Sequence, residues 1–308
     1  MINELQRDFA SGFLLRQIDR VVFQSTRTIK SRDEETIHDL RVAIRRLIQG
    51  LAVFRPDFTS KKPRKIRKSL KHVLSLAGAV RDCDVALECI AKIQSPHAAR
   101  IREMLRAERK KAEAPLVENL RHIVLRKASR QWRREFETAH LHEVPGRETA
   151  INVARRTLPR AVQVFLRRGD QAAAGARTAE QLHQFRLAAK KFRYTFEIFT
   201  GLYRSISSGI LEQLKAVQQA LGKINDCATT RNLLARLGAH PDLQAALKAR
   251  ERRKTAQFRQ LWTVQFSGSG DIRRWPQLLL SPDSLQPFEE AADRAPVPVQ
   301  TLAAASTS

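Results

Sequence analysis

Apolar residues recur along most of this chain at the spacing of amphipathic helices, and two segments carry the same polar face beside the apolar one. The first segment, 37–54, reads IHDLRVAIRRLIQGLAVF, and the second, 182–199, reads LHQFRLAAKKFRYTFEIF. On a helix of about 3.6 residues per turn, their large apolar residues gather on one side, and a histidine with several cations lies beside it. The aligned positions are His38 with His183, Arg41 with Arg186, Arg45 with Lys190 and Arg46 with Lys191.

A second pair of matching motifs follows these segments at nearly the same offset. Residues 76–85 read LAGAVRDCDV, and residues 221–230 read LGKINDCATT. Because the offset between the copies stays nearly constant over both motifs, the sequence indicates an internal duplication. The aligned positions are Gly78 with Gly222, Asp82 with Asp226 and Cys83 with Cys227.

The expected fold class is all-α, with two pseudo-symmetric helical bundles, because the remaining periodic segments also predict helices. We place the N-terminal bundle at 1–140, the C-terminal bundle at 141–265 and a tail at 266–308. The tail is assigned because 276–308 is rich in proline, alanine and serine and has no steady period. The predicted helices outside the two histidine segments are 3–28, 61–77, 97–136 with a kink at Pro115, 148–168, 207–220, 228–237 and one ending near Trp262.

One glycine and one run of charged residues add two details to the predicted helices. Gly78 is predicted to break the helix that contains 61–77, with Asp82 or Asp84 capping the helix that follows. The charged run 106–113 is expected to be exposed on its helix. Asp82, Asp84 and Asp226 are expected to cap helices and pair with arginines rather than to bind a metal.

The charge balance of the chain calls for an anionic partner. The 308 residues include 56 Lys and Arg against 31 Asp and Glu, a formal net charge of +25. Such an excess repels itself unless a polyanion or counterions neutralise it. Nucleic acid, an anionic membrane and inorganic polyphosphate all satisfy that requirement, so charge alone does not choose among them.

The paired motifs resemble the CHAD domain, the conserved histidine α-helical domain, over about residues 2–262. The resemblance implies two pseudo-symmetric four-helix bundles around a basic groove or pore that binds inorganic polyphosphate. The residues that carry it are His38, Arg41-Val42, Arg45-Arg46, Arg81-Asp82-Cys83-Asp84-Val85, His183, Arg186, Lys190-Lys191, Arg193-Tyr194, Glu197, Leu221-Gly222 and Asn225-Asp226.

A linear anion without bases needs only a long row of guanidinium and ammonium groups, whose hydrogen bonds to phosphate oxygens are charge-assisted. We therefore expect a non-catalytic polyphosphate site with no metal and no cofactor. The alternatives are that the histidines are ordinary core residues and that the basic stripes are solvated helix faces. The predicted polyphosphate-binding residues are His38, Arg41, Arg45, Arg46, Arg64, Lys68, Lys71, His183, Arg186, Lys190, Lys191, Arg193 and Lys215.

Two other functions stay open at the level of sequence. A nucleic-acid binder is compatible with the charge, but no helix-turn-helix, zinc finger or RNA-binding signature occurs, and aromatic residues do not interleave with the cations. An enzyme acting on polyphosphate is disfavoured because the chain has no Walker A run and no ExExK motif. An accessory role beside a polyphosphate-metabolising enzyme remains compatible with a binding module.

The expected location is the cytoplasm, with polyphosphate granules as the expected destination. Three cysteines, Cys83, Cys89 and Cys227, make no disulfide framework and are expected to be reduced. The charged N-terminal segment does not read as a signal peptide, and no run of about 18 apolar residues predicts a membrane span.

Overall fold

The computed structural model describes residues 6–55, 61–125, 128–137, 149–174, 179–238, 241–266, 271–281 and 284–285. These ranges contain helices and no strand, which confirms the all-α prediction. The α-helices are α1 (Gln6–Lys30), α2 (Glu34–Val53), α3 (Lys62–Ile90), α4 (Ala98–Leu125), α5 (Ala128–Glu137), α6 (Ala150–Ala173), α7 (Ala179–Ile198), α8 (Arg204–Arg236), α9 (Pro241–Phe266) and α10 (Trp275–Leu278), and the short 3₁₀ helices are η3 (Thr200–Leu202) and η4 (Asp271–Arg274).

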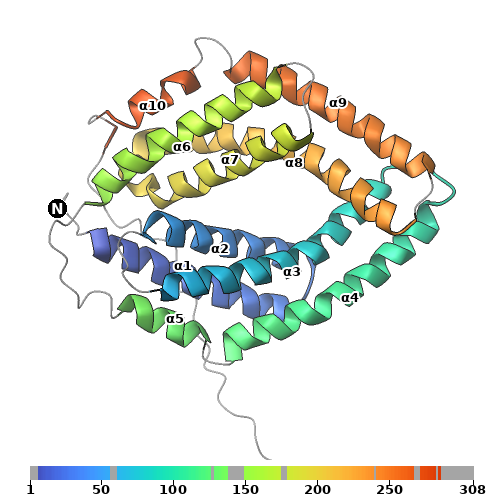
Figure 1. Cartoon of the computed structure of the whole chain (residues 1–308), viewed down its shortest axis with the longest axis horizontal. Coiled ribbons are helices and arrows are strands. Elements are labelled where there is room, and N and C mark those ends of the chain that lie inside the picture. Colours follow the sequence, from blue (N-terminus) through green and yellow to red (C-terminus); the bar gives the residue numbers. More distant parts are fainter. Residues whose placement is uncertain are drawn as a thin grey trace, which may run out of the picture.

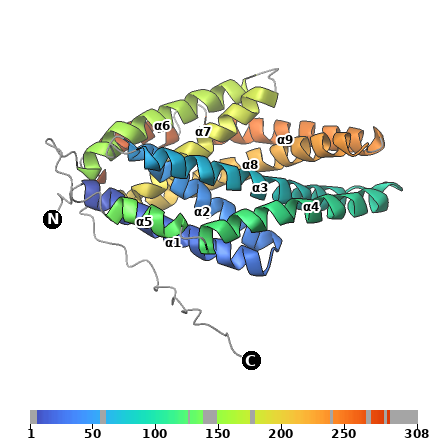
Figure 2. The same ribbon diagram turned by 60° about the horizontal axis from the view of Figure 1, so that its bottom comes forward.

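The helices form two groups that follow the order of the chain. Helices α1–α5 lie on one side of the molecule and α6–α10 on the other (Figure 1). The groups meet where α2 packs against α7 and where α3 packs against α8. The antiparallel pairs α3–α4 and α8–α9 project toward the same end of the molecule (Figure 2). No helix among the described residues has the length and apolar character needed to span a membrane.

Most of the buried apolar residues form one core that extends through both groups. In the second group, Trp262 stacks on Phe266 with ring centroids 4.7 Å apart, and Phe185 meets the Trp262 ring edge-on at 4.9 Å. A smaller core lies where the two projecting pairs meet, with Leu105 of α4 and Leu247 of α9 both fully buried. These two cores fix the relative positions of α2, α3, α7 and α8, the four helices that carry the candidate site.

The predicted helix break at Gly78 is wrong, because α3 continues through this residue, and α8 likewise continues through Gly222. At Gly78 the absent side chain makes room for a cation: a Cβ there would lie 3.0 Å from Nη1 of Arg41. That guanidinium donates a hydrogen bond to the backbone oxygen of Leu74, at 3.1 Å. Gly78 therefore permits a close approach within a continuous helix, and Asp82 and Asp84 lie inside that helix instead of capping a new one.

Other boundaries also differ from the prediction, and the helices expected at 207–220 and 228–237 form one helix, α8. The single helix expected over 97–136 is two helices, α4 and α5, and α4 contains Pro115 in its interior. The first part of the predicted tail is helical and packed, because Trp275 and Leu279 are buried. The hydroxyl of Tyr203 donates a 2.9 Å hydrogen bond to the backbone oxygen of Leu279 and fixes this segment to the second group.

Candidate anion-binding site

Helices α2 and α7 carry the two histidine segments and lie against each other at the junction of the two groups. Asp33 caps the start of α2 by accepting a 2.7 Å hydrogen bond from the backbone N–H of Thr36, which satisfies one free donor of the first turn. The side-chain amide of Gln49 on α2 donates a 2.8 Å hydrogen bond to the hydroxyl of Thr195 on α7. These contacts set the start of α2 and its position against α7, and so place the cations on the two helices.

Four of the predicted cations come together at this junction, and we call them the central cluster: Arg41, Arg45, Arg186 and Lys190. Each pair, Arg41 with Arg45 and Arg186 with Lys190, is spaced i, i+4 and so lies on one face of its helix. Burial first, and then the charge of Arg45, lowers the pKa of Lys190 to about 6 and that of Arg41 to about 10. The same two causes lower the pKa of Arg186.

Like charges that are partly buried together destabilise each other unless an anion neutralises them, and strongly shifted pKa values are typical of functional sites. Two carboxylates face the central cluster from the neighbouring helices, Asp82 of α3 and Asp226 of α8. Burial raises the pKa of both, and the charges of the cluster oppose that rise. Within the described ranges no ion pair joins either carboxylate to the cluster, so these two carboxylates, at longer range, offset only part of its charge.

The two histidines stand about one turn before Arg41 and Arg186 on their helices. Both His38 and His183 are exposed, so neither is a core histidine. The pKa of His38 is lowered, first by partial desolvation and then by the charge of Arg81, with smaller effects from Arg45 and Arg41. His38 is therefore close to the central cluster, at its solvent edge.

Other predicted site residues lie elsewhere. Arg46, Arg193 and Lys215 line a separate cavity of about 450 Å³. Glu197 accepts from Nε of Arg46 at 2.8 Å and from Nε of Arg193 at 2.7 Å, so it is both an interhelical and an intrahelical ion-pair partner. The remaining predicted cations have exposed side chains; they are Arg64, Lys68 and Lys71 on α3 and Lys191 on α7.

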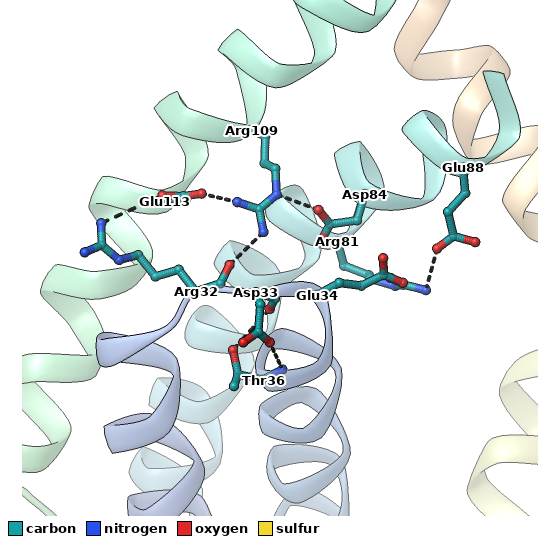
Figure 3. A network of polar contacts seen from close by, with 9 residues as sticks. All are labelled: Arg32, Asp33, Glu34, Thr36, Arg81, Asp84, Glu88, Arg109 and Glu113. Atoms are coloured by element: carbon teal, nitrogen blue, oxygen red, sulfur yellow. Dashed lines mark hydrogen bonds and ion pairs between the residues drawn. The ribbon is translucent and has the colours of Figure 1, made fainter. Parts of the chain in front are cut away.

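Arg81 lies near the central cluster, although it is not among the predicted polyphosphate-binding residues. Burial raises the pKa of both Asp82 and Asp226, and the charge of Arg81 is among those that oppose this rise. The Arg81 guanidinium itself pairs with Glu34 and lies 3.5 Å from a carboxylate oxygen of Glu88 (Figure 3). The signal in the sequence was its place in the motif at 81–85, directly before the aspartate that the two copies share.

Arg109 contradicts the expectation that the run 106–113 is exposed. Its side chain is only 19% exposed, and it donates to the buried carboxylate of Asp84 at 2.5 Å and to Glu113 (Figure 3). It also donates a 2.7 Å hydrogen bond to the backbone oxygen of Arg32, which has a left-handed φ of 57° in the turn between α1 and α2. Arg109 therefore joins α4 to α3 and to this turn, and it is structural.

The described residues contain no group of three or more His, Cys, Asp or Glu side chains placed to hold a metal ion. The site that the fold assembles is thus a compact group of cations at the meeting point of four long helices. Such an arrangement suits an anion, because guanidinium forks like those of Arg41, Arg45 and Arg186 donate charge-assisted hydrogen bonds to oxyanions.

These features define the class of molecule: an all-α protein with a buried cationic cluster between two helical groups. The sequence model of the CHAD domain matches residues 13–235, so this chain belongs to the CHAD domain family. A comparison with curated proteins finds no match.

Two solved structures share the fold. The crystal structure of the CHAD domain from the plant Ricinus communis superposes with a TM-score of 0.69 at 22% sequence identity, covering 92% of this chain and 95% of that chain. PptA from Streptomyces chartreusis gives a TM-score of 0.58 at 17% identity, covering 84% of this chain and 100% of that chain. The likeness extends over most of the chain in both cases and concerns the fold.

Proposed function

We propose that this chain binds inorganic polyphosphate at the central cluster and that it does so without catalysing a reaction. The observation that supports this most directly is the concentration of four cations on α2 and α7, of which Lys190 has its pKa lowered to about 6. A polyanion in contact with these groups would relieve their mutual repulsion and accept their hydrogen bonds. Membership of the CHAD family supports the same ligand, as the resemblance implied.

A linear phosphate chain suits the cluster better than nucleic acid does. Nonspecific single-strand binding combines a basic surface with aromatic rings on which bases stack. The aromatic residues of α7 that flank Arg186 and Lys190 in sequence, Phe185, Phe192 and Tyr194, are at most 8% exposed. A phosphate chain needs no such platform, so the cations suffice.

Competition at fixed ionic strength tests the choice of ligand. Labelled short-chain polyphosphate is bound to the protein and challenged with unlabelled polyphosphate or with single- and double-stranded DNA at equal phosphate concentration. Unlabelled polyphosphate is expected to displace the label at much lower concentration than DNA. Displacement by DNA at equal concentration would favour the nucleic-acid alternative, and release of phosphate in the presence of Mg²⁺ or Mn²⁺ would show an enzyme.

We further propose that binding carries the protein to polyphosphate granules in the cytoplasm, where it would meet polyphosphate-metabolising enzymes. A fluorescent fusion is expected to overlap with granules stained for polyphosphate. The same fusion carrying Arg41→Glu and Arg186→Glu is expected to spread through the cell. Granule localisation that survives this change would separate targeting from the central cluster.

The affinity for polyphosphate is expected to fall steeply with salt, because each neutralised phosphate releases condensed counterions. If the four cations of the central cluster each replace one counterion, the log–log slope is about −0.7 for each contact, or roughly −2.8. A fourfold rise in salt should then weaken binding about fiftyfold. Titrations at several salt concentrations measure the slope, and an affinity that does not change with salt would exclude an electrostatic site.

Polyphosphate binding is also expected to take up a proton on Lys190. In the free protein its pKa is about 6, so the amine is mostly neutral at pH 7. Bound phosphates would raise that pKa, so affinity should fall as pH rises above about 6, by up to tenfold per pH unit, and should level off below pH 6. Calorimetry in buffers of different ionisation enthalpy measures the uptake.

Lys190→Arg is the matched control for this proton, because a guanidinium stays charged throughout the pH range. The variant should bind without the proton uptake assigned to Lys190. Equal uptake by the variant and the original protein would assign the proton to a different group.

A further inference from the structure

The pairs α3–α4 and α8–α9 project toward one end of the molecule (Figure 1), and a second group of cations lines a cavity there, outside the central cluster. A cavity of about 490 Å³ is formed there between the residues that follow α3 and one face of α9. We call it the tip cavity. Its polar lining residues are Lys92, Gln94, Arg250, Arg253 and Lys254.

Every ionisable residue that lines the tip cavity is a cation. Three carboxylates near this end have partners: Asp242 accepts from Ser95 at 2.6 Å, Glu251 accepts from Arg231 at 2.8 Å, and Glu88, one turn before Lys92, lies 3.5 Å from Arg81. The four charges therefore converge on one hollow without a carboxylate in its lining to offset them.

The residues from α9 form a stripe on that helix. Ala246, Arg250, Arg253 and Lys254 are spaced i, i+4, i+7 and i+8, so they share one face. Arg250 lies near the buried thiol of Cys89 on α3, whose pKa is lowered first by a hydrogen bond with Cys227 of α8 and to a smaller degree by the charge of Arg250.

We propose that the tip cavity is a second anion site, which binds a diphosphate group. A single phosphate carries at most about two negative charges at neutral pH, which is fewer than the four cations present. Two linked phosphates supply more charge and enough oxygens for two guanidinium forks and two ammonium groups. The volume also falls within the range of about 300–1,000 Å³ that is usual for small-ligand pockets.

This site is independent of the proposed function, because it shares no residue with the central cluster. Its ligand could be the end of a polyphosphate chain, free pyrophosphate or the diphosphate of a nucleotide. All three present the same linked phosphates, so the chemistry is common and only the source differs.

The test is a titration of the full-length protein with pyrophosphate, carried out in the Arg41→Glu/Arg186→Glu background so that the central cluster does not contribute. Calorimetry gives the affinity, and ¹H–¹⁵N spectra of the arginine Nε–Hε groups in the original protein locate the ligand. Arg250→Gln/Arg253→Gln is expected to weaken pyrophosphate binding at least about tenfold, since one lost charge-assisted contact alone has that effect. The Arg250 and Arg253 signals should shift on titration.

Lys248→Gln/Arg252→Gln is the matched control, because both residues are exposed and lie on the opposite face of α9. It removes the same charge and should change the affinity less than about twofold. Equal weakening by the two double variants, or unshifted Arg250 and Arg253 signals, would overturn the proposal. Loss of long-chain polyphosphate binding in the background, with pyrophosphate binding retained, would separate this site from the central cluster.

Adding short-chain polyphosphate and a nucleoside diphosphate as further ligands identifies the source. Tighter binding of polyphosphate would assign the cavity to a chain end, and tighter binding of the nucleotide would assign it to a soluble metabolite. If neither these ligands nor pyrophosphate bind the background protein and the Arg250 and Arg253 signals of the original protein stay in place, the tip cavity is not a diphosphate site.

Discussion

Reversing the charge of Arg41 and Arg186 together should weaken polyphosphate binding by more than about a hundredfold. The two arginines stand at aligned positions of the two histidine helices, and both have lowered pKa values because they are buried beside Arg45. Each charge-assisted hydrogen bond contributes about 1.5–3 kcal/mol, so losing one on each helix accounts for that factor before repulsion is added. Fluorescence or calorimetric titration with polyphosphate of defined length measures the change.

The control for this experiment is Arg106→Glu/Lys110→Glu on α4. Both residues are exposed, and the substitution changes the net charge by the same amount. Arg109 would be unsuitable as a control because its pairing with Asp84 is structural. Circular dichroism must show that both variants are folded. Similar losses of affinity in the two would mean that the overall charge, and not the central cluster, binds the ligand.

The sequence predicts most of the helices correctly because their apolar periodicity is strong, and it fails where tertiary contacts decide. Glycine inside a helix costs only about 1 kcal/mol relative to alanine, so packing overrides it easily. At Gly78 the space left by the missing side chain is used by Arg41, a residue of another helix. No local pattern around 78 could reveal that contact.

The central cluster could be predicted in part, because helical spacing decides which cations share a face. The i, i+4 spacing places Arg41 with Arg45, and it places Arg186 with Lys190, so each helix brings two cations to one face. Arg46 is one residue beyond Arg45 and about 100° further round the helix, so it points elsewhere. There it meets Glu197, which is distant in sequence and is identified as its partner only when α2 packs against α7.

The burial of charged side chains could not be predicted from the sequence. The run 106–113 looks like a solvated surface, yet Arg109 lies between α3 and α4 because Asp84 is enclosed there, with only 6% of its side chain exposed. A carboxylate so enclosed is stable only with a cation beside it, since an unpaired buried charge is costly. Arg109 of α4 meets that requirement, but the requirement exists only because the fold encloses Asp84.

Arg109→Met should therefore lower the free energy of unfolding substantially, by about 3 kcal/mol, the lower end of the range for breaking a buried pair, since Arg109 is partly exposed. The variant leaves Asp84 without its cation, and Oδ2 of Asp84 already has no hydrogen-bond partner among the described residues. It also removes the donor that holds the backbone oxygen of Arg32 in its left-handed turn. Urea unfolding at pH 7 measures the loss.

The pH dependence of that loss tests its cause. Burial already raises the pKa of Asp84, and removing Arg109 should raise it further. A carboxyl group whose pKa is higher in the folded state costs stability as pH rises through its unfolded pKa, near 4, toward its folded value. The deficit of Arg109→Met should thus be smaller at pH 4 than at pH 7, and Asp84→Asn should restore part of it at pH 7.

Arg106→Met, one turn earlier on the exposed face of α4, should change stability by less than about 0.5 kcal/mol. A deficit under about 1 kcal/mol, or one that does not vary with pH, would show that Asp84 does not depend on Arg109.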